Sequence, residues 1–212
     1  NIRGEDSNGM LCSEREMGLS DEHDGIIELA DDAPIGAPFA QIMGLDDPVI
    51  DINVTPNKQD CLGIRGIARD LAAAGMGTLK PLDATPVEGS YDSPINVELN
   101  FAKGYEAACS CFLGRHFRGL TNGPSPDWLR RRLTAIGLRP ISALVDMTNF
   151  ITYDLGRPLH VFDAGKVNGN IQARMATAGE TFLALDGKDY ELDGEITVIA
   201  DQKAAEAIGG VM

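Results

Sequence analysis

The stretch GLRPISALVDMTNFITYDLGRPLHVFD, residues 137–163, carries the clearest structural signals in this chain of 212 residues. Ser142 is a good helix cap, apolar residues recur after it at helical spacing, and Gly156 ends the pattern. We therefore predict a helix between these two residues, followed directly by a turn or extended segment that contains His160. Asp146, in the first turn of this helix, is expected to be a charge on the helix surface.

A second helix is predicted immediately before it, in GPSPDWLRRRLTAIG at residues 123–137. Ser125 suits the N-cap, Pro126 suits the first helical residue, and Gly137 suits the end of the helix. Three apolar residues share one face and are expected to be buried: Leu129, Leu133 and Ile136. The three arginines between them point mostly away from that face, and Trp128 is expected to be a packing residue.

The remaining segments predict one more helix and several strands. The helix is expected between Asp60, as its cap, and Gly75. Asp186 and Gly187 suit the two-residue turn of a hairpin. Strand-like patterns occur in DINV (51–54), VELNF (97–101), CFLGRHFRGL (111–120), NIQARMA (170–176), TFLAL and YEL beside that turn, and ITVIA (196–200), with loops and short strands over 21–50. This mixture predicts the α+β fold class.

The chain has a formal net charge of −14, which taken alone argues against a nucleic-acid partner. Residues 108–140, however, carry one acid and six arginines: Arg115, Arg118, Arg130, Arg131, Arg132 and Arg139. This basic island is either a solvated helix face with scattered surface arginines or a patch that contacts phosphate groups.

No apolar run approaches the roughly 20 residues that span a bilayer, and the polar start NIRGEDSNGM does not resemble a signal peptide. The cysteines form no CxxC pair and no histidine cluster accompanies them; they are Cys12, Cys61, Cys109 and Cys111. We therefore expect a cytoplasmic protein with reduced thiols, no membrane span and no metal site. A start without methionine suggests a fragment.

Four stretches, in this order, resemble the β subunit of bacterial phenylalanyl-tRNA synthetase: NVTPNKQDCLGIRGIARDLAA, GPSPDWLRRRL, GLRPISALVDMTNFITYDLGRPLHVFD and LDGKDYEL. The resemblance covers essentially the whole chain. It implies that residues 1–18 are the end of a tRNA-binding OB-fold domain and that residues 19–80 form a small helical, winged-helix-like B1 domain. Residues 81–94 would be a linker, and residues 95–212 a mixed α/β B3/B4 editing domain that is incomplete at its C-terminus.

Members of this family join phenylalanine to its tRNA, using ATP and Mg²⁺ at the α subunit of an (αβ)₂ heterotetramer. The resemblance therefore implies an α subunit and tRNA(Phe) as partners, and no cofactor in this chain itself. The B3/B4 region hydrolyses tyrosine that has been attached to this tRNA by error. The truncated piece alone is expected to lack synthetic activity and to be nearly inert.

Two motifs of the family, RPI-x₄-VD-x-TN and PLH-x-FD, assign roles to residues of this chain. They imply that Arg139 and His160 line the editing pocket as catalytic residues, with Thr148 and Asn149 as substrate-binding neighbours. The run Arg130, Arg131 and Arg132 supplies the candidates for contact with tRNA. His160 has a competing interpretation, because a histidine in an apolar run is more often a packed, hydrogen-bonded core residue.

Two other functions stay open from the sequence. One is a non-catalytic module that binds tRNA or a subunit through Arg65 and Arg69, and the other is a stand-alone aminoacyl-tRNA deacylase. The chain also departs from the family pattern, with Lys58-Gln59 where Arg-Pro is common. It ends before the segment that supplies the family's glutamate for the tyrosine hydroxyl. Asp163 is expected to cap locally or to pair with Arg157.

Overall fold

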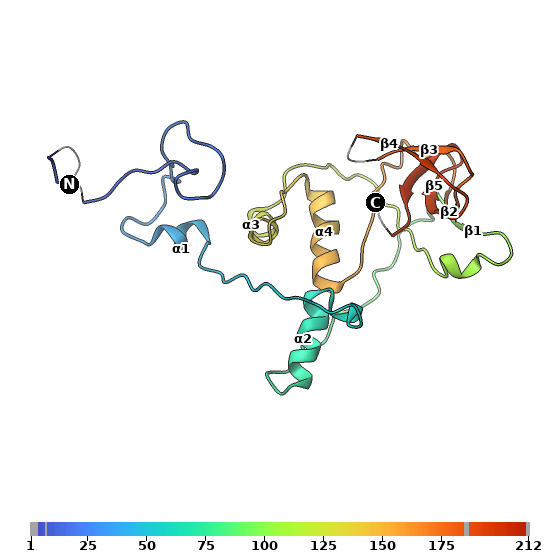
Figure 1. Ribbon diagram of the computed structural model, residues 1–212, viewed down its shortest axis with the longest axis horizontal. Helices are drawn as coiled ribbons and strands as arrows, with labels where there is room; N and C mark the ends of the chain where they lie inside the picture. The colour runs from blue at the N-terminus through green and yellow to red at the C-terminus, as the bar shows by residue number, and fades with distance from the viewer. Residues whose placement is uncertain (1–3, 7, 185–186, 211–212) are drawn as a thin grey trace. The chain divides into compact units, whose positions relative to one another are not determined.

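The computed structural model describes residues 4–6, 8–184 and 187–210 of a chain whose contacts form two compact units, 1–51 and 52–212 (Figure 1). The first unit consists mainly of loops and contains one short helix, α1, at Phe39–Met43. Gly44 ends α1 in the left-handed conformation, with φ of 65°. The fully described residues 21–50 contain no strand, so the expectation of short strands there is wrong.

The second unit contains the three predicted helices, which are α2 at Ile64–Ala73, α3 at Asp127–Ala135 and α4 at Ala143–Leu155. Its described residues also form two 3-10 helices that were not predicted, η1 at Gln59–Cys61 and η2 at Glu106–Ala108. Gly63 is the N-cap of α2, so the prediction of Asp60 as the cap is wrong, because the Asp60 carboxylate pairs instead with Arg69. Gly75 follows the helix with φ of 77°, as its position predicted.

Helix α3 begins one residue later than predicted, with Pro126 as its N-cap. Leu129 and Leu133 are buried, each 1% exposed, which confirms two members of the predicted apolar face. Ile136 is 43% exposed, because the helix has already ended at Ala135. The prediction that Ile136 would be buried is therefore wrong.

Helix α4 agrees with its prediction at both ends, with Ser142 as the N-cap and Gly156 as the left-handed C-cap at φ of 66°. Asp146 is 0% exposed, so the expectation of a surface charge is wrong. Its carboxylate is the acceptor for the Ser125 hydroxyl, which explains why Ser125 does not cap α3.

The strands form a four-stranded sheet and a separate hairpin. The sheet contains β1 at Val97–Asn100, β2 at Ile171–Met175, β5 at Thr197–Ala200 and β6 at Ala205–Ile208, in the order β1-β2-β5-β6. β1 runs parallel to β2, and the other two pairs are antiparallel. The hairpin pairs β3 at Glu180–Leu183 with β4 at Asp189–Leu192.

Strand prediction succeeded where a partner strand exists. The predicted segments 97–101, 170–176 and 196–200 and the hairpin are confirmed, whereas β6 was not predicted. The predicted turn residue Asp186 lies outside the described residues. Segments 51–54 and 111–120 form no strand, so both predictions are wrong: each is an irregular run without a paired neighbour.

The inner strand β5 is buried on both faces, whereas the edge strand β1 is largely exposed. Val198 and Ala200 lie in one apolar cluster with residues of the hairpin, while Ile199 lies in a second cluster on the opposite face. Loop side chains cover the second cluster, among them Phe112 and Phe162. The segment 111–120 therefore packs onto the sheet through an aromatic residue instead of joining it.

A buried carboxylate fixes the turn between β5 and β6. Asp201 is 1% exposed and accepts hydrogen bonds from the side chain and backbone of Asn168 and from the backbone N–H groups of Lys203 and Ala204. Burial alone would raise the pKa of Asp201, but these hydrogen bonds outweigh it and lower the pKa to about 2.

Candidate functional site

His160 lies on the extended segment that leaves α4, and its side chain is exposed. Its ring stacks on that of Phe162, with centroids 6.0 Å apart and an interplanar angle of 24°. Phe162 in turn packs against the second apolar cluster of the sheet. His160 is therefore not a buried core residue. Phe162 packs against the sheet and holds the segment in place, while the His160 imidazole is exposed to solvent.

The start of the His160 segment is held by a close contact of two backbones. Gly156 ends α4 directly against Gly63 at the start of α2, where a Cβ on Gly63 would lie 2.4 Å from the Gly156 nitrogen. The Thr152 hydroxyl donates to the Thr148 carbonyl at 2.8 Å and lies 3.4 Å from the Arg157 carbonyl. The contact of the two glycine backbones therefore fixes the point at which the chain leaves α4.

Asp163, at the end of the same segment, acts locally. Its carboxylate accepts the backbone N–H of Gly165 at 3.0 Å, and its carbonyl accepts the N–H of Lys166. Among the described residues no ion pair joins it to Arg157, so the local-cap alternative is the one that the structure supports.

Arg139 is exposed on the short loop between α3 and α4. Within the described parts of the chain, no hydrogen bond, ion pair or ring contact joins Arg139 to His160. Their convergence on one pocket therefore stays a prediction. Thr148 and Asn149 are half-buried on α4, and the Thr148 hydroxyl donates to the Val145 carbonyl at 2.7 Å.

The buried carboxylate of Asp146 connects the segments around α3 and α4, and this role was not predicted from the sequence. One Asp146 oxygen accepts the backbone N–H of Ile141 at 2.9 Å, and the other accepts the hydroxyl of Ser125. This carboxylate therefore joins the loop before α3 to the loop before α4. Its only sequence signal is an acidic residue in the first helical turn, which does not distinguish a buried residue from an exposed one.

The N-terminus of α4 is capped by a residue far away in sequence. Asn122 accepts the backbone N–H of Leu144 at 3.3 Å and donates its amide to the Ser142 hydroxyl at 3.1 Å. The backbone N–H of Ala143 donates to the Gly123 carbonyl at 2.8 Å. Two of the helix's orphan donors are thus satisfied by the segment that leads into α3.

The three arginines of α3 are exposed, and two of them have contacts within the helix. Arg130 forms an ion pair of 3.4 Å with Asp127, and Arg132 lies 6.0 Å from the centroid of the Trp128 ring. Trp128 meets Phe150 of α4 edge to face at 5.6 Å, although it remains 54% exposed. The packing role predicted for Trp128 is therefore partial.

Other cations of the basic island contact the segment proposed as a linker. Arg118 lies 3.9 Å over the Tyr91 ring, and Arg115 donates to the carbonyl of Val87. The Tyr91 hydroxyl lies 3.0 Å from Nδ1 of His116. Residues 87–91 are therefore attached to residues 115–118 by both ring and hydrogen-bond contacts.

A polar cluster lies between η1 and α2. Lys58 and Arg69 both pair with Asp60 and Asp70, and the Cys61 thiol donates to Asp70 at 3.2 Å. Hydrogen bonds from Lys58, and then from Cys61 and Arg69, lower the pKa of Asp70 to about 2. The carboxylates of this cluster are matched by two cations of the chain itself.

Arg65, the other cation of the α2 outer face, donates to the Lys80 carbonyl at 3.2 Å. It also lines an apolar groove of about 360 Å³ between α2, residues 76–82 and the end of α4. Neither Arg139 nor His160 lines this groove. The guanidinium groups proposed for a binding module are thus engaged within the chain.

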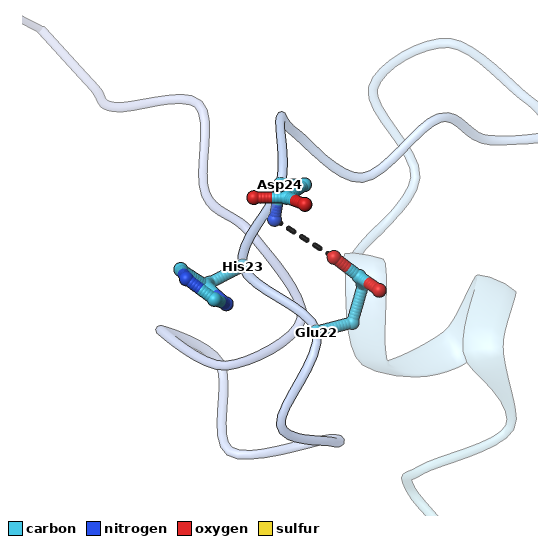
Figure 2. Close-up of side chains that lie close together, drawn as sticks. All are labelled: Glu22, His23 and Asp24. Atoms are coloured by element: carbon cyan, nitrogen blue, oxygen red, sulfur yellow. Dashed lines mark hydrogen bonds between the residues drawn. The ribbon is translucent and has the colours of Figure 1, made fainter.

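Among the residues that the structure describes, two groups of side chains bring potential metal ligands within 4.8 Å of one another. One is the paired cluster of Asp60, Cys61 and Asp70, where the neighbouring cations disfavour a further positive charge. The other is the exposed loop of Glu22, His23 and Asp24 (Figure 2), where the Asp24 N–H donates to Glu22 at 2.8 Å. We assign a metal to neither group. Over the described residues, no helix combines the length and apolar character needed to cross a bilayer.

Comparisons with known proteins agree with the resemblance in sequence. Residues 108–212 match the B3/4 domain family. Phenylalanine--tRNA ligase β subunits of Brucella abortus (strain 2308) and Paramagnetospirillum magneticum are each 57% identical over 211 residues, and that of Rhodopseudomonas palustris is 55% identical over 212. Each match covers 100% of this chain and 26% of the relative, so the chain spans about a quarter of their length. Residues 108–212 are thus similar to the B3/4 domain family, and the whole chain is similar to part of phenylalanine--tRNA ligase β subunits.

Proposed function

We propose that this chain is part of a phenylalanine--tRNA ligase β subunit and that its B3/4 domain hydrolyses tyrosine attached by error to tRNA(Phe). The observation that carries the proposal is identity of 57% along the entire chain to subunits of that name, together with the B3/4 match. The solvent-exposed His160, anchored by Phe162, supports it because a hydrolytic site must admit water.

The complete enzyme follows from the same proposal. The β subunit pairs with an α subunit in a cytoplasmic (αβ)₂ heterotetramer that binds tRNA(Phe), and ATP and Mg²⁺ act at the synthetic site of the α subunit. Residues 1–18 belong to an OB-fold domain, residues 19–80 to a B1-like, winged-helix-like domain, and residues 81–94 to the linker before the editing domain at 95–212. The exposed Arg130, Arg131 and Arg132 contribute to the contact with tRNA.

The need for such a site follows from the chemistry of the two amino acids. Tyrosine differs from phenylalanine by one hydroxyl, and an apolar pocket rejects such an analogue only weakly. A second site that hydrogen-bonds the hydroxyl binds tyrosine and rejects phenylalanine, because phenylalanine would leave a buried polar group unpaired. Hydrolysis at that second site removes the error after it has been made.

The reaction is attack of water on the ester that joins tyrosine to the terminal ribose. One proton leaves the water and one is delivered to the departing ribose oxygen, so the products are tyrosine and free tRNA. His160 orients the water or the ribose hydroxyl and can relay a proton. Arg139 stabilises the terminal phosphate or the ester carbonyl oxygen by charge-assisted hydrogen bonds. No covalent intermediate is required.

The test is single-turnover deacylation of preformed Tyr-tRNA(Phe) by the holoenzyme. His160→Ala should slow release of tyrosine by about 100-fold, the lower range for a lost acid–base group. His23→Ala, an exposed histidine of the first unit, is the matched control and should release tyrosine at the wild-type rate. A wild-type rate for His160→Ala would remove His160 from the mechanism. A wild-type enzyme that leaves Tyr-tRNA(Phe) intact would refute the proposed function.

A further inference from the structure

The most deeply buried charged group outside the predicted pocket is Asp146 of α4, at 0% exposure. A buried carboxylate is costly unless hydrogen bonds compensate it. Here both oxygens are engaged, one by the backbone N–H of Ile141 and one by the hydroxyl of Ser125. Neither partner is a cation. The carboxylate therefore serves as a double acceptor that fixes two loops.

One of those loops carries Arg139. On its N-terminal side, the backbone N–H of Leu138 donates to the Leu133 carbonyl at 2.9 Å, which ties the loop to the end of α3. On its C-terminal side, the Ile141 N–H is held by Asp146 at 2.9 Å. Only Arg139 and Pro140 lie between these two anchors, and the proline ring restricts its own φ.

The backbone of Arg139 is thus fixed from both sides while its side chain is exposed. The two anchors differ in kind. The bond at Leu138 continues the end of α3 locally, whereas the bond at Ile141 depends on a single side chain. Loss of that side chain would extend the stretch between backbone anchors from residues 139–140 to residues 139–142, because the next anchor is the Ala143 N–H on the Gly123 carbonyl.

We propose that Asp146 is a positioning residue for editing: through its bond to the Ile141 N–H it holds the loop that aims Arg139. This inference rests on the proposed function, since it assumes that Arg139 takes part in the hydrolysis of Tyr-tRNA(Phe). Asp146 itself touches neither substrate nor water.

The two hydrogen bonds of Asp146 predict which substitutions preserve editing. Asp146→Asn keeps both bonds, because the amide oxygen accepts from Ile141 and the amide nitrogen donates to the Ser125 oxygen. Asp146→Ala removes both bonds. Ser125→Ala removes only the bond that does not reach the Arg139 loop. A purely structural role for Asp146 predicts instead that editing follows the loss of stability, whichever bond is removed.

The experiment is a double-mutant cycle in the holoenzyme, measured as kcat/KM for deacylation of preformed Tyr-tRNA(Phe). Asp146→Ala should lower kcat/KM by about 10-fold or more, the scale of one hydrogen bond to a charged group. In the Arg139→Ala background it should lower kcat/KM by less than about 2-fold, because the group it positions is absent. Asp146→Asn and Ser125→Ala should both stay within about 3-fold of wild type, and charging with phenylalanine reports on assembly.

Each outcome of this experiment either supports or overturns the positioning role of Asp146. Equal losses from Asp146→Ala with and without Arg139 would overturn the positioning role while leaving the proposed function standing. If Asp146→Ala does not assemble, Asp146→Asn decides: an assembled variant that loses editing overturns the inference, and one that retains it supports it. A wild-type holoenzyme without deacylation overturns both the inference and the proposed function.

Discussion

Replacing Gly63 by alanine would separate two backbones that the structure brings into direct contact. Gly63 has an extended backbone, with φ of −143° and ψ of 157°, which any residue can adopt. A Cβ there would lie 2.4 Å from the Gly156 nitrogen and 2.9 Å from the Leu155 carbonyl carbon. Neither atom belongs to a side chain that could rotate away, so α2 and the end of α4 must move apart.

The size of the effect follows from the cost of inserting one methyl group into a packed contact. Overpacking by a methylene or methyl typically costs about 1–3 kcal/mol. If the strain is relieved by local separation of α2 from α4, the amides of residues 64–73 should exchange with solvent about 5- to 150-fold faster. The Gly156 N–H, which donates to the Thr152 carbonyl at the end of α4, should lose protection with them.

Hydrogen exchange followed by mass spectrometry, on the full-length protein, measures this change. Gly77→Ala is the matched control, because no atom lies within 4 Å of its added Cβ. This control should change exchange by no more than about 2-fold, as expected for a substitution costing less than ~0.5 kcal/mol. Unchanged exchange of α2 in Gly63→Ala would refute the claim that the two backbones are in contact.

Further predictions concern the helical core, the buried turn and the basic helix. Leu133→Ala should lower the free energy of unfolding by about 2–5 kcal/mol, whereas Ile136→Ala should lower it by less than about 1 kcal/mol, measured by urea denaturation. The depressed pKa of Asp201 means that its contribution to stability is complete above about pH 4 and is lost as the pH falls toward 2. Asp201→Asn should therefore flatten the dependence of the urea midpoint on pH in that window, and an unchanged profile would contradict the assignment. For any of Arg130, Arg131 and Arg132 that contacts a tRNA phosphate, replacement by alanine has a measurable effect on salt dependence. It should reduce the magnitude of the slope of log K, where K is the tRNA-binding constant, against log salt concentration by about 1. A slope that falls only with Arg65→Ala would favour α2 as the binding surface.

The features that could be predicted from the sequence are those whose signals are local. Ser142 and Gly156 bound α4 as predicted, and the left-handed Gly156 acts within the last turn, although the Ser142 side chain makes no capping hydrogen bond. The β3–β4 hairpin also depends on local signals, since its two short strands and their turn are neighbours in sequence. In both cases the residues that mark the ends of the element lie in it or beside it.

The predictions that were wrong depend on contacts between residues that are far apart in sequence. Segment 111–120 has a strand-like pattern, yet it pairs with neither edge strand of the sheet β1-β2-β5-β6 and instead packs against the sheet through Phe112. Asp146 was expected at the surface because the contact that buries it comes from Ser125, 21 residues away. The cap of α4 by Asn122 is equally remote and has no signature in the helix itself.

The roles of the candidate site residues stay predictions. The exposure of His160 excludes only the competing interpretation as a buried core histidine. Its support by Phe162 could not be predicted, because ring stacking between residues two apart depends on how the segment crosses the sheet. Whether Arg139 and His160 act on one substrate depends on side-chain directions that spacing along the chain does not encode.

The most direct measurement is therefore the structure of the holoenzyme with a non-hydrolysable tyrosyl-adenosine analogue bound. If the proposed editing mechanism holds, the ester-mimicking group lies within hydrogen-bonding distance of both the His160 imidazole and the Arg139 guanidinium. An analogue that binds residues 108–212 without touching either side chain, or that does not bind these residues at all, would contradict the proposed mechanism.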